Sequence, residues 1–328
     1  MKAVGQEGSQ GHPAQAQAND ECLTEPLKLS AEMMRAERHE NEQQATNEQK
    51  AKAGRDKRAL GISPLQISAR GHHHDVASLS FRSKIRVVTY NVHGFVGTDG
   101  VYQPERIARV LERSEADVMA LQEVDAGTGR GLDSHAYDWL ADRLGMTCHF
   151  RLTRPGKYGP FGNAVFTKRR FEVVAEGLLP HRRDEPRAAQ WLRIEAGSAD
   201  FDLLNTHLSI KEGERNVQLQ SLVGAEWLLR HSSERPLILC GDFNTTPWSK
   251  TYRELSRSFT DVQKAKPARR RATWPARFPL LRLDHVFVPS TVEVEGCHVL
   301  DHAEARVASD HLPLVADLWL PTASKGNP

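Results

Sequence analysis

The chain has 328 residues, of which 39% are hydrophobic and 26% are charged, and its formal net charge is +2 at pH 7. That size and composition allow one large domain with a sizeable core, or two small domains. A net charge so close to zero does not by itself favour a nucleic-acid-binding protein or a membrane-surface protein. No run of about 18 apolar residues occurs, so the sequence predicts no transmembrane segment.

The beginning of the chain differs in composition from the rest. No Trp, Tyr or Phe precedes Phe81, so residues 1–83 lack the side chains that usually build a packed core. Residues 30–57 have a helix-forming composition but few apolar positions that could form a stripe. We interpret residues 1–83 as an N-terminal extension, either a solvated helix or disordered, residues 84–321 as the catalytic domain and residues 322–328 as a tail.

Two features bear on the cellular compartment. The first 30 residues lack the apolar run of a secretory signal. The four cysteines, Cys22, Cys148, Cys240 and Cys297, are widely scattered and show neither the spacing of a metal site nor a disulfide framework. We therefore expect a protein of the reducing cytoplasm.

From Ile85 onward, short apolar runs alternate with segments of helical periodicity. Strands are predicted over 85–92, 118–125, 162–168, 190–196, 200–209, 236–244, 282–289 and 311–320. Helices are predicted over 104–117, 134–144 and 214–233. A strand-helix-strand unit occurs twice, and two mixed β-sheets packed face to face and flanked by helices, a four-layer α/β sandwich, would satisfy this pattern.

Polar residues stand where the apolar strands end. Together with polar residues near the starts of other strands they make up the candidate site residues Asn91, Glu123, Asn163, His207, Asp242, Asn244, Asp284, Asp310 and His311. Carboxylate and amide oxygens suit a hard cation such as Mg²⁺ or Mn²⁺, and such a cation with nearby histidines suits hydrolysis of a phosphate ester. The sequence has no Cys/His cluster for zinc, no Gly-x-Ser-x-Gly and no Walker loop.

Seven motifs in order resemble those of the endonuclease/exonuclease/phosphatase superfamily. They are TYNVHG, LQEVD, GNAVFTK, NTHL, GDFNTTPWS, RLDHVFV and SDHLPLVADL, and together they cover about residues 84 to 320. Single motifs such as SDH are weak evidence, whereas seven in the family's order are strong evidence. The resemblance implies a DNase I-like fold and metal-dependent hydrolysis of phosphate esters.

The resemblance also implies where a metal and a catalytic histidine lie. Glu123 is similar to the family's metal-ligand glutamate, with Asn91 and Asp310 completing the metal neighbourhood for Mg²⁺ or Mn²⁺. His311 is similar to the family's terminal catalytic histidine, and Asp284 is its expected partner carboxylate. Whether one or two metal ions act is left open.

Four further residues receive roles from the same resemblance. Asp242 resembles the aspartate that positions or deprotonates the attacking water, and Asn244 helps to orient that water or the phosphate. His207 resembles the histidine that contacts the scissile phosphate. Asn163 resembles the phosphate-binding amide.

Arg187 is a candidate site residue because of its position in the sequence and not because of the family resemblance. It follows Pro186 and stands just before a predicted strand, so its side chain is a candidate phosphate ligand. The alternative interpretation is a surface ion pair with Asp184 or Glu185.

Residues 264–285 form a basic segment that leads directly into Asp284, so we expect it to lie against the site. It carries seven Lys or Arg residues together with Trp274 and Phe278. Arginines bind phosphate and Trp can stack on a base, which favours nucleic acid, while the same residues also suit an anionic phospholipid surface. The alternative is a solvated basic loop with both aromatic side chains packed beneath it.

The sequence therefore predicts a metal-dependent phosphodiesterase with nuclease-type chemistry, acting on nucleic acid or another phosphate ester. Leu281-Arg282-Leu283 stands where abasic-site nucleases typically carry Gly-Trp-Arg, which puts abasic-DNA repair in doubt. A phospholipid or sphingomyelin-type phosphodiesterase and a small-molecule phosphatase are the alternatives, and a decayed binding module is a remote one. The sequence leaves the oligomeric state open.

Overall fold

The computed structural model describes residues 82–127, 135–156, 159–182, 185–197, 200–224, 227–228, 235–267 and 271–321. The predicted extension, apart from its last two positions, and the predicted tail lie outside these ranges, as do Arg269 and Arg270 of the basic segment. Ser83 already belongs to the first strand, so regular structure begins one residue before the predicted domain boundary.

Two six-stranded sheets form the centre of the fold. The first has the strand order β11 (Glu293–Val299), β12 (Leu314–Leu320), β1 (Ser83–Asn91), β2 (Val118–Asp125), β4 (Pro160–Thr167), β3 (Thr147–Pro155). The second has the order β5 (Phe171–Leu178), β6 (Ala188–Ile194), β7 (Phe201–His207), β8 (Leu237–Asp242), β10 (Asp284–Val288), β9 (Thr260–Asp261). Both sheets are mixed, because β1–β2 and β7–β8 pair in parallel while the other pairs are antiparallel.

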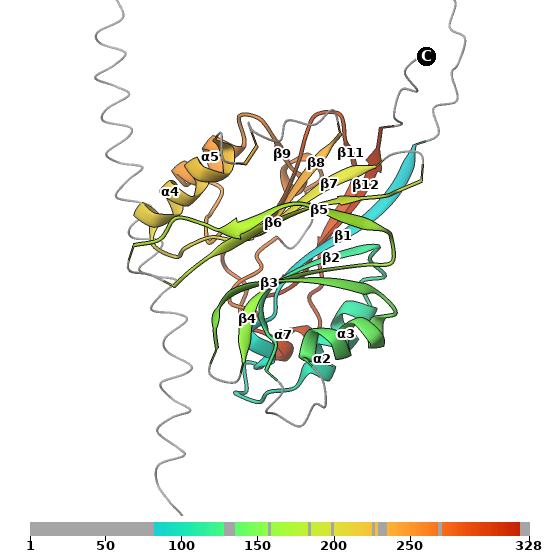
Figure 1. Ribbon diagram of the computed structural model, residues 1–328, viewed down its shortest axis with the longest axis vertical. Coiled ribbons are helices and arrows are strands. Elements are labelled where there is room, and N and C mark those ends of the chain that lie inside the picture. The colour runs from blue at the N-terminus through green and yellow to red at the C-terminus, as the bar shows by residue number, and fades with distance from the viewer. Residues whose placement is uncertain are drawn as a thin grey trace, which may run out of the picture. The chain divides into compact units, whose positions relative to one another are not determined.

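Helices cover the outer faces of the sheets (Figure 1). On the side of the first sheet lie α2 (Pro104–Glu112), α3 (Ala136–Leu144) and α7 (Ala305–Ala308), and on the side of the second lie α4 (Glu212–Val223) and α5 (Lys250–Leu255). Two short elements, η1 (His93–Phe95) and α6 (Val262–Ala265), complete the described set. The predicted four-layer sandwich is confirmed. Among the described helices, none has the length and apolar character needed to cross a bilayer.

Successive residues of the central strands point to different cores. Leu203 belongs to the cluster that joins the two sheets, and Leu204 belongs to the cluster that packs with α4 and α5. Val286 and Phe287 divide in the same way on β10. A strand buried on both faces needs apolar residues at every position, which explains the continuous apolar runs of the sequence.

The predicted elements differ from the structure mainly at the sheet edges and helix ends. The four edge strands, β3, β5, β9 and β11, were not predicted, and partial exposure at a sheet edge permits polar residues. The short helices α5, α6 and α7 were not predicted either. The helix predicted over 214–233 ends at Val223, where Gly224 adopts an extended conformation. Glycine is a weak helix former, and Trp227 and Leu228 beyond it lie in a turn.

Candidate active site

Strand register brings the polar strand ends to one edge of the sandwich. On the second sheet, Asp242 at the end of β8 lies opposite His207 of β7 on one side and Asp284 of β10 on the other. On the first sheet, Asn91 at the end of β1 pairs with Gln122, the residue before Glu123. Because parallel neighbours end at the same edge of a sheet, these groups converge.

A glycine permits the close strand approach beside Asp242. Gly241 has φ +148°, and a Cβ atom there would lie 1.9 Å from the carbonyl oxygen of Thr206 on β7. Any side chain at this position would separate the two strands. The Gly-Asp sequence therefore places Asp242 against the end of β7.

Asp242 is the buried centre of the site. Its Oδ2 accepts a hydrogen bond from Nδ2 of Asn91 at 3.0 Å and lies 3.4 Å from Nε2 of His207 and 3.6 Å from Nε2 of His311. Its Oδ1 accepts the backbone N–H of Asn244 at 2.9 Å. Burial raises the pKa of Asp242 to about 7, although His311 acts in the opposite direction.

His311 forms a buried pair with Asp284. Nδ1 of His311 lies 2.8 Å from Oδ2 of Asp284, so the predicted partner is in contact. Burial by itself would lower the pKa of His311, but the surrounding carboxylates, Asp284 and then Asp242, outweigh it and hold that pKa well above its ordinary value. The imidazole is therefore kept charged, with its Nε2 directed at Asp242.

His207 has the opposite electrostatic environment. Its Nδ1 lies 2.7 Å from Nη1 of Arg187 and its Nε2 lies 3.1 Å from Nδ2 of Asn244. Burial lowers the pKa of His207 well below its ordinary value, and the charges of Arg187 and His311 act in the same direction. Two histidines that flank one carboxylate therefore carry different charges.

Glu123 and Asp310 are the less buried carboxylates of the site. Their side chains are 22% and 30% exposed, whereas that of Asp242 is 1% exposed. Oε1 of Glu123 accepts Nδ2 of Asn91 at 3.0 Å, and the side-chain oxygen of Asn91 accepts the backbone N–H of His93. Partly accessible carboxylate oxygens, as in Glu123 and Asp310, fit a hard divalent cation. Asn91 orients the carboxylates of Glu123 and Asp242 by donating to both.

A second group could also hold a cation. One ligand atom from each of Asp242, Asp284 and His311 lies within 4.8 Å of the others. The protonated imidazole described above makes this group a poorer cation site than Glu123 and Asp310, because a metal-bound histidine must be neutral.

The backbone is strained at two site residues. Glu123 has φ +56° and Asn244 has φ +46°, in the left-handed region that side chains other than glycine rarely adopt. Such conformations persist where the surrounding structure holds them, and they cluster at functional sites.

Trp274 belongs to the site in a way that the sequence did not predict. Its indole Nε1 donates to Oδ2 of Asp310 at 3.2 Å, and the residue is only 4% exposed. The basic segment does lie against the site, since the N–H of Ala276 also bonds the carbonyl of Asp310. Of the two interpretations, packing beneath the loop holds for Trp274, whose buried ring is not placed to stack on a base, but not for Phe278, which is 66% exposed.

The two predicted substrate-binding residues lie side by side in the structure. Asn163 of β4 is buried and donates to the carbonyl of Ala188, the residue that follows Arg187. Arg187 is 8% exposed, and its Nη2 lies 3.1 Å from Oε2 of Glu185. The predicted ion pair with Glu185 therefore exists together with the contact to His207.

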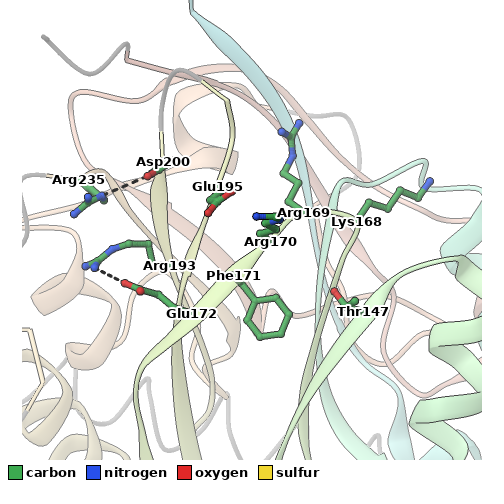
Figure 2. Close-up of a pocket in the computed structure, with 10 residues that line it drawn as sticks. All are labelled: Thr147, Lys168, Arg169, Arg170, Phe171, Glu172, Arg193, Glu195, Asp200 and Arg235. Carbon is green, nitrogen blue, oxygen red and sulfur yellow. Dashed lines mark hydrogen bonds and ion pairs between the residues drawn. The ribbon is translucent and has the colours of Figure 1, made fainter.

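A cavity of about 660 Å³ lies at the opposite ends of the same strands (Figure 2). Its cationic lining residues are Lys168, Arg169, Arg170, Arg193 and Arg235. Arg193 pairs with Glu172 and Arg235 with Asp200, so acids balance part of this charge. Asp200 precedes the start of β7 and His207 ends it, which separates this cavity from the candidate site by the length of a strand.

The comparisons with known proteins agree with this geometry. Residues 88–311 match the model of the Endonuclease/Exonuclease/phosphatase family. The chain belongs to this family, whose members are phosphoester hydrolases.

Relatives resemble the chain over most of their length. YbhP, an uncharacterised protein of Escherichia coli K12, is 29% identical over 255 residues, which cover 72% of this chain and 96% of YbhP. A family member from Beutenbergia cavernae has a TM-score of 0.61 and 25% identity over 73% of this chain and 72% of its own. A mannosyl-6-phosphatase of Bacteroides thetaiotaomicron shares the fold, with a TM-score of 0.58 and 21% identity over 71% of this chain and 99% of its own.

Proposed function

We propose that the protein is a phosphodiesterase that requires Mg²⁺ or Mn²⁺ and uses nuclease-type chemistry. The observation that carries the proposal is the surroundings of Asp242. This buried carboxylate is held by Asn91 and lies between a charged histidine, His311, and a neutral one, His207. Phosphoester hydrolysis needs a general base for the attacking water and a charged hydrogen-bond donor, here the imidazolium of His311, for the phosphoryl oxygens.

Glu123 and Asp310 would hold the divalent cation, and Asn91 would hold Glu123 in place. When bound, the cation neutralises negative charge that develops on the phosphoryl oxygens. Trp274 fixes the orientation of Asp310 through its indole N–H. The geometry supports a site that is open toward solvent on the side of these two carboxylates.

The reaction begins with a water molecule held by Asp242. A pKa of about 7 makes this carboxylate an effective proton acceptor at neutral pH, so it takes the proton as the water oxygen attacks phosphorus. The bond from phosphorus to the leaving oxygen breaks in the same step, and the leaving alkoxide takes a proton from solvent. The charged His311, held by Asp284, stabilises the phosphoryl oxygens through its Nε2–H. Asn244 and His207 border the same space and orient the water and the phosphate.

The loop beside Asp310 bears on the substrate. Arg277 is exposed there, and so are Phe278 and Leu280 at 66% and 54%, while Lys264 of α6 and Lys266 are exposed at the start of the basic segment. Cations with exposed aromatic and aliphatic groups fit a nucleic acid strand, in which phosphates alternate with bases. The same loop also fits a phospholipid headgroup, so an experiment must distinguish nucleic acid from phospholipid as the substrate.

The test compares four substrates with the full chain. They are bis(4-nitrophenyl) phosphate, plasmid DNA, phosphatidylcholine vesicles that contain phosphatidylserine, and mannose 6-phosphate, each with Mg²⁺, Mn²⁺ or EDTA. We expect cation-dependent cleavage of the aryl diester and the DNA, and none by Asp242→Asn. Turnover of mannose 6-phosphate alone would replace the proposal with a phosphomonoesterase, and turnover of the vesicles alone would replace it with a lipid phosphodiesterase.

A further inference from the structure

Arg187 contacts a nitrogen of the active-site histidine. The residue directly precedes β6, is 8% exposed, and brings its Nη1 to 2.7 Å from Nδ1 of His207. A guanidinium stays charged and has only N–H donors. Nδ1 of His207 must therefore be the acceptor of this hydrogen bond and carries no proton.

The position of the remaining proton follows from this contact. A neutral imidazole carries one N–H, so the proton of His207 is on Nε2. This nitrogen lies 3.4 Å from Oδ2 of Asp242, an acceptor, and 3.1 Å from Nδ2 of Asn244, a donor. An amide nitrogen has only N–H donors and cannot accept this proton, so the carboxylate of Asp242 is the acceptor that the Nε2–H faces.

The guanidinium is itself held in place by charged neighbours. Glu185 lies 3.1 Å from Nη2 of Arg187 with one carboxylate oxygen, and its other oxygen accepts from Nε of Arg154. The Arg154 guanidinium lies over the ring of Phe161, 4.2 Å from its centroid. The row Arg154–Glu185–Arg187 leaves Arg187 little freedom to turn away from His207.

We infer that Arg187 is a positioning residue that sets the tautomer of His207, so that His207 presents an Nε2–H donor to the reaction centre. The catalytic consequence of this inference rests on the proposed function. The inference differs from the interpretation of Arg187 as a phosphate ligand, because its guanidinium acts on the substrate only through the imidazole. If Arg187 served only as a phosphate ligand, replacing it would leave the tautomer of His207 unchanged.

The first test measures the tautomer directly. Nitrogen-15 NMR of the full chain, with histidine labelled and His207 assigned by His207→Gln, distinguishes a protonated from an unprotonated ring nitrogen. We expect His207 to be neutral with its proton on Nε2, and to shift toward the Nδ1–H form in Arg187→Met. A wild-type His207 with its proton on Nδ1, or on both nitrogens, would overturn the inference whether or not the protein is an enzyme.

The second test is a kinetic double-mutant cycle on bis(4-nitrophenyl) phosphate. Arg187→Met should lower kcat by about 10- to 100-fold with little change in KM, and Arg187→Lys, which keeps a donor, should recover part of it. In the His207→Gln background, Arg187→Met should change kcat by less than about twofold. Arg182→Met, at an exposed position on the same loop, is the matched control.

Failure of the positioning role and failure of the proposed function give different experimental results. Equal losses from Arg187→Met with and without His207, seen mainly in KM, would contradict the positioning role and support a phosphate ligand. Absence of turnover in the wild-type chain would contradict the proposed function, and the NMR measurement would still decide the tautomer.

Discussion

Oδ2 of Asp284 lies 2.8 Å from Nδ1 of His311, and both side chains are buried at the edge where β8 and β10 meet. The carboxylate accepts from Nδ1, which leaves Nε2 of His311 directed toward Asp242 at 3.6 Å. Two carboxylates around one imidazole favour its charged form. The pair thus keeps a proton donor beside the carboxylate that we propose as the base.

Replacing Asp284 tests this relationship. Asp284→Asn keeps the shape of the side chain but removes the charge that holds His311 protonated, so kcat should fall by roughly 100-fold or more while the fold is retained. Steady-state kinetics and thermal unfolding measure the two effects. The exposed Asp138→Asn on α3 is the control, and a kcat for Asp284→Asn equal to that of the control would rule out the proposed role.

Replacing Asp242 separates binding from chemistry. Asp242→Asn retains a group that can accept from Asn91 but cannot take a proton, so kcat should fall by about 10³-fold while KM changes by less than about threefold. Kinetics on the aryl diester give both constants. A large rise in KM with an unchanged kcat would mean that Asp242 binds substrate and is not the base.

Removing a proposed cation ligand should act on metal affinity first. Glu123→Gln and Asp310→Asn should each weaken Mn²⁺ binding by about tenfold or more, because each loses a charged oxygen donor. Titration calorimetry of the full chain, stripped with EDTA and dialysed, measures this without substrate. Glu195→Gln, exposed at the opposite ends of the strands, should bind Mn²⁺ as the wild type does. Unchanged affinity in both site variants would place the cation elsewhere.

The convergence of the site was predictable from the sequence because it depends on strand direction. Asn91, His207 and Asp242 each end a strand that is buried on both faces, and runs of that kind are easily recognised. Once two strands are parallel, their last residues share an edge. The positions of these side chains therefore follow from local pattern and topology alone.

The contacts that depend on side chains from distant segments were not predictable in the same way. The sequence left open whether Trp274 stacks on a base or packs beneath the loop, and its indole is buried against Asp310. Arg187 was expected to bind either phosphate or an acid, Asp184 or Glu185, and its contact with His207 joins the residue before β6 to the last residue of β7. The burial of the Trp274 ring and the contact between Arg187 and His207 depend on loop conformation, which the local hydrophobic pattern of the sequence does not determine.

Trp274 gives a prediction that distinguishes a structural tryptophan from a base-stacking one. Trp274→Phe keeps most of the buried ring but loses the N–H to Asp310, so kcat should fall by about two- to tenfold. Affinity for single-stranded DNA in fluorescence anisotropy should stay within about twofold of wild type, since the ring is not accessible. Phe278→Ser at the exposed position is the comparison, and DNA affinity lost only in Trp274→Phe would reverse the assignment.

The last prediction concerns stability in acid. Asp261 is fully buried, where it accepts from Tyr252 at 2.7 Å and pairs with Arg282. Burial opposes its ionisation, but His285 and Arg282 outweigh burial and hold the pKa of Asp261 well below its ordinary value of 3.8. A lowered pKa in the folded state means that the charged carboxylate stabilises the fold above about pH 3.8 and loses this effect as pH falls through the folded pKa.

Asp261→Asn should therefore lower the free energy of unfolding by about 3–5 kcal/mol at pH 7, because it leaves the Arg282 charge buried without its partner. The difference from wild type should narrow as pH falls from 3.8 toward the lower folded pKa, because in this range Asp261 of the unfolded chain is protonated and that of the folded protein is still charged. Urea unfolding at a series of pH values measures both curves, with the exposed Asp138→Asn as control. Parallel curves for wild type and Asp261→Asn across that range would show that Asp261 carries no linked proton.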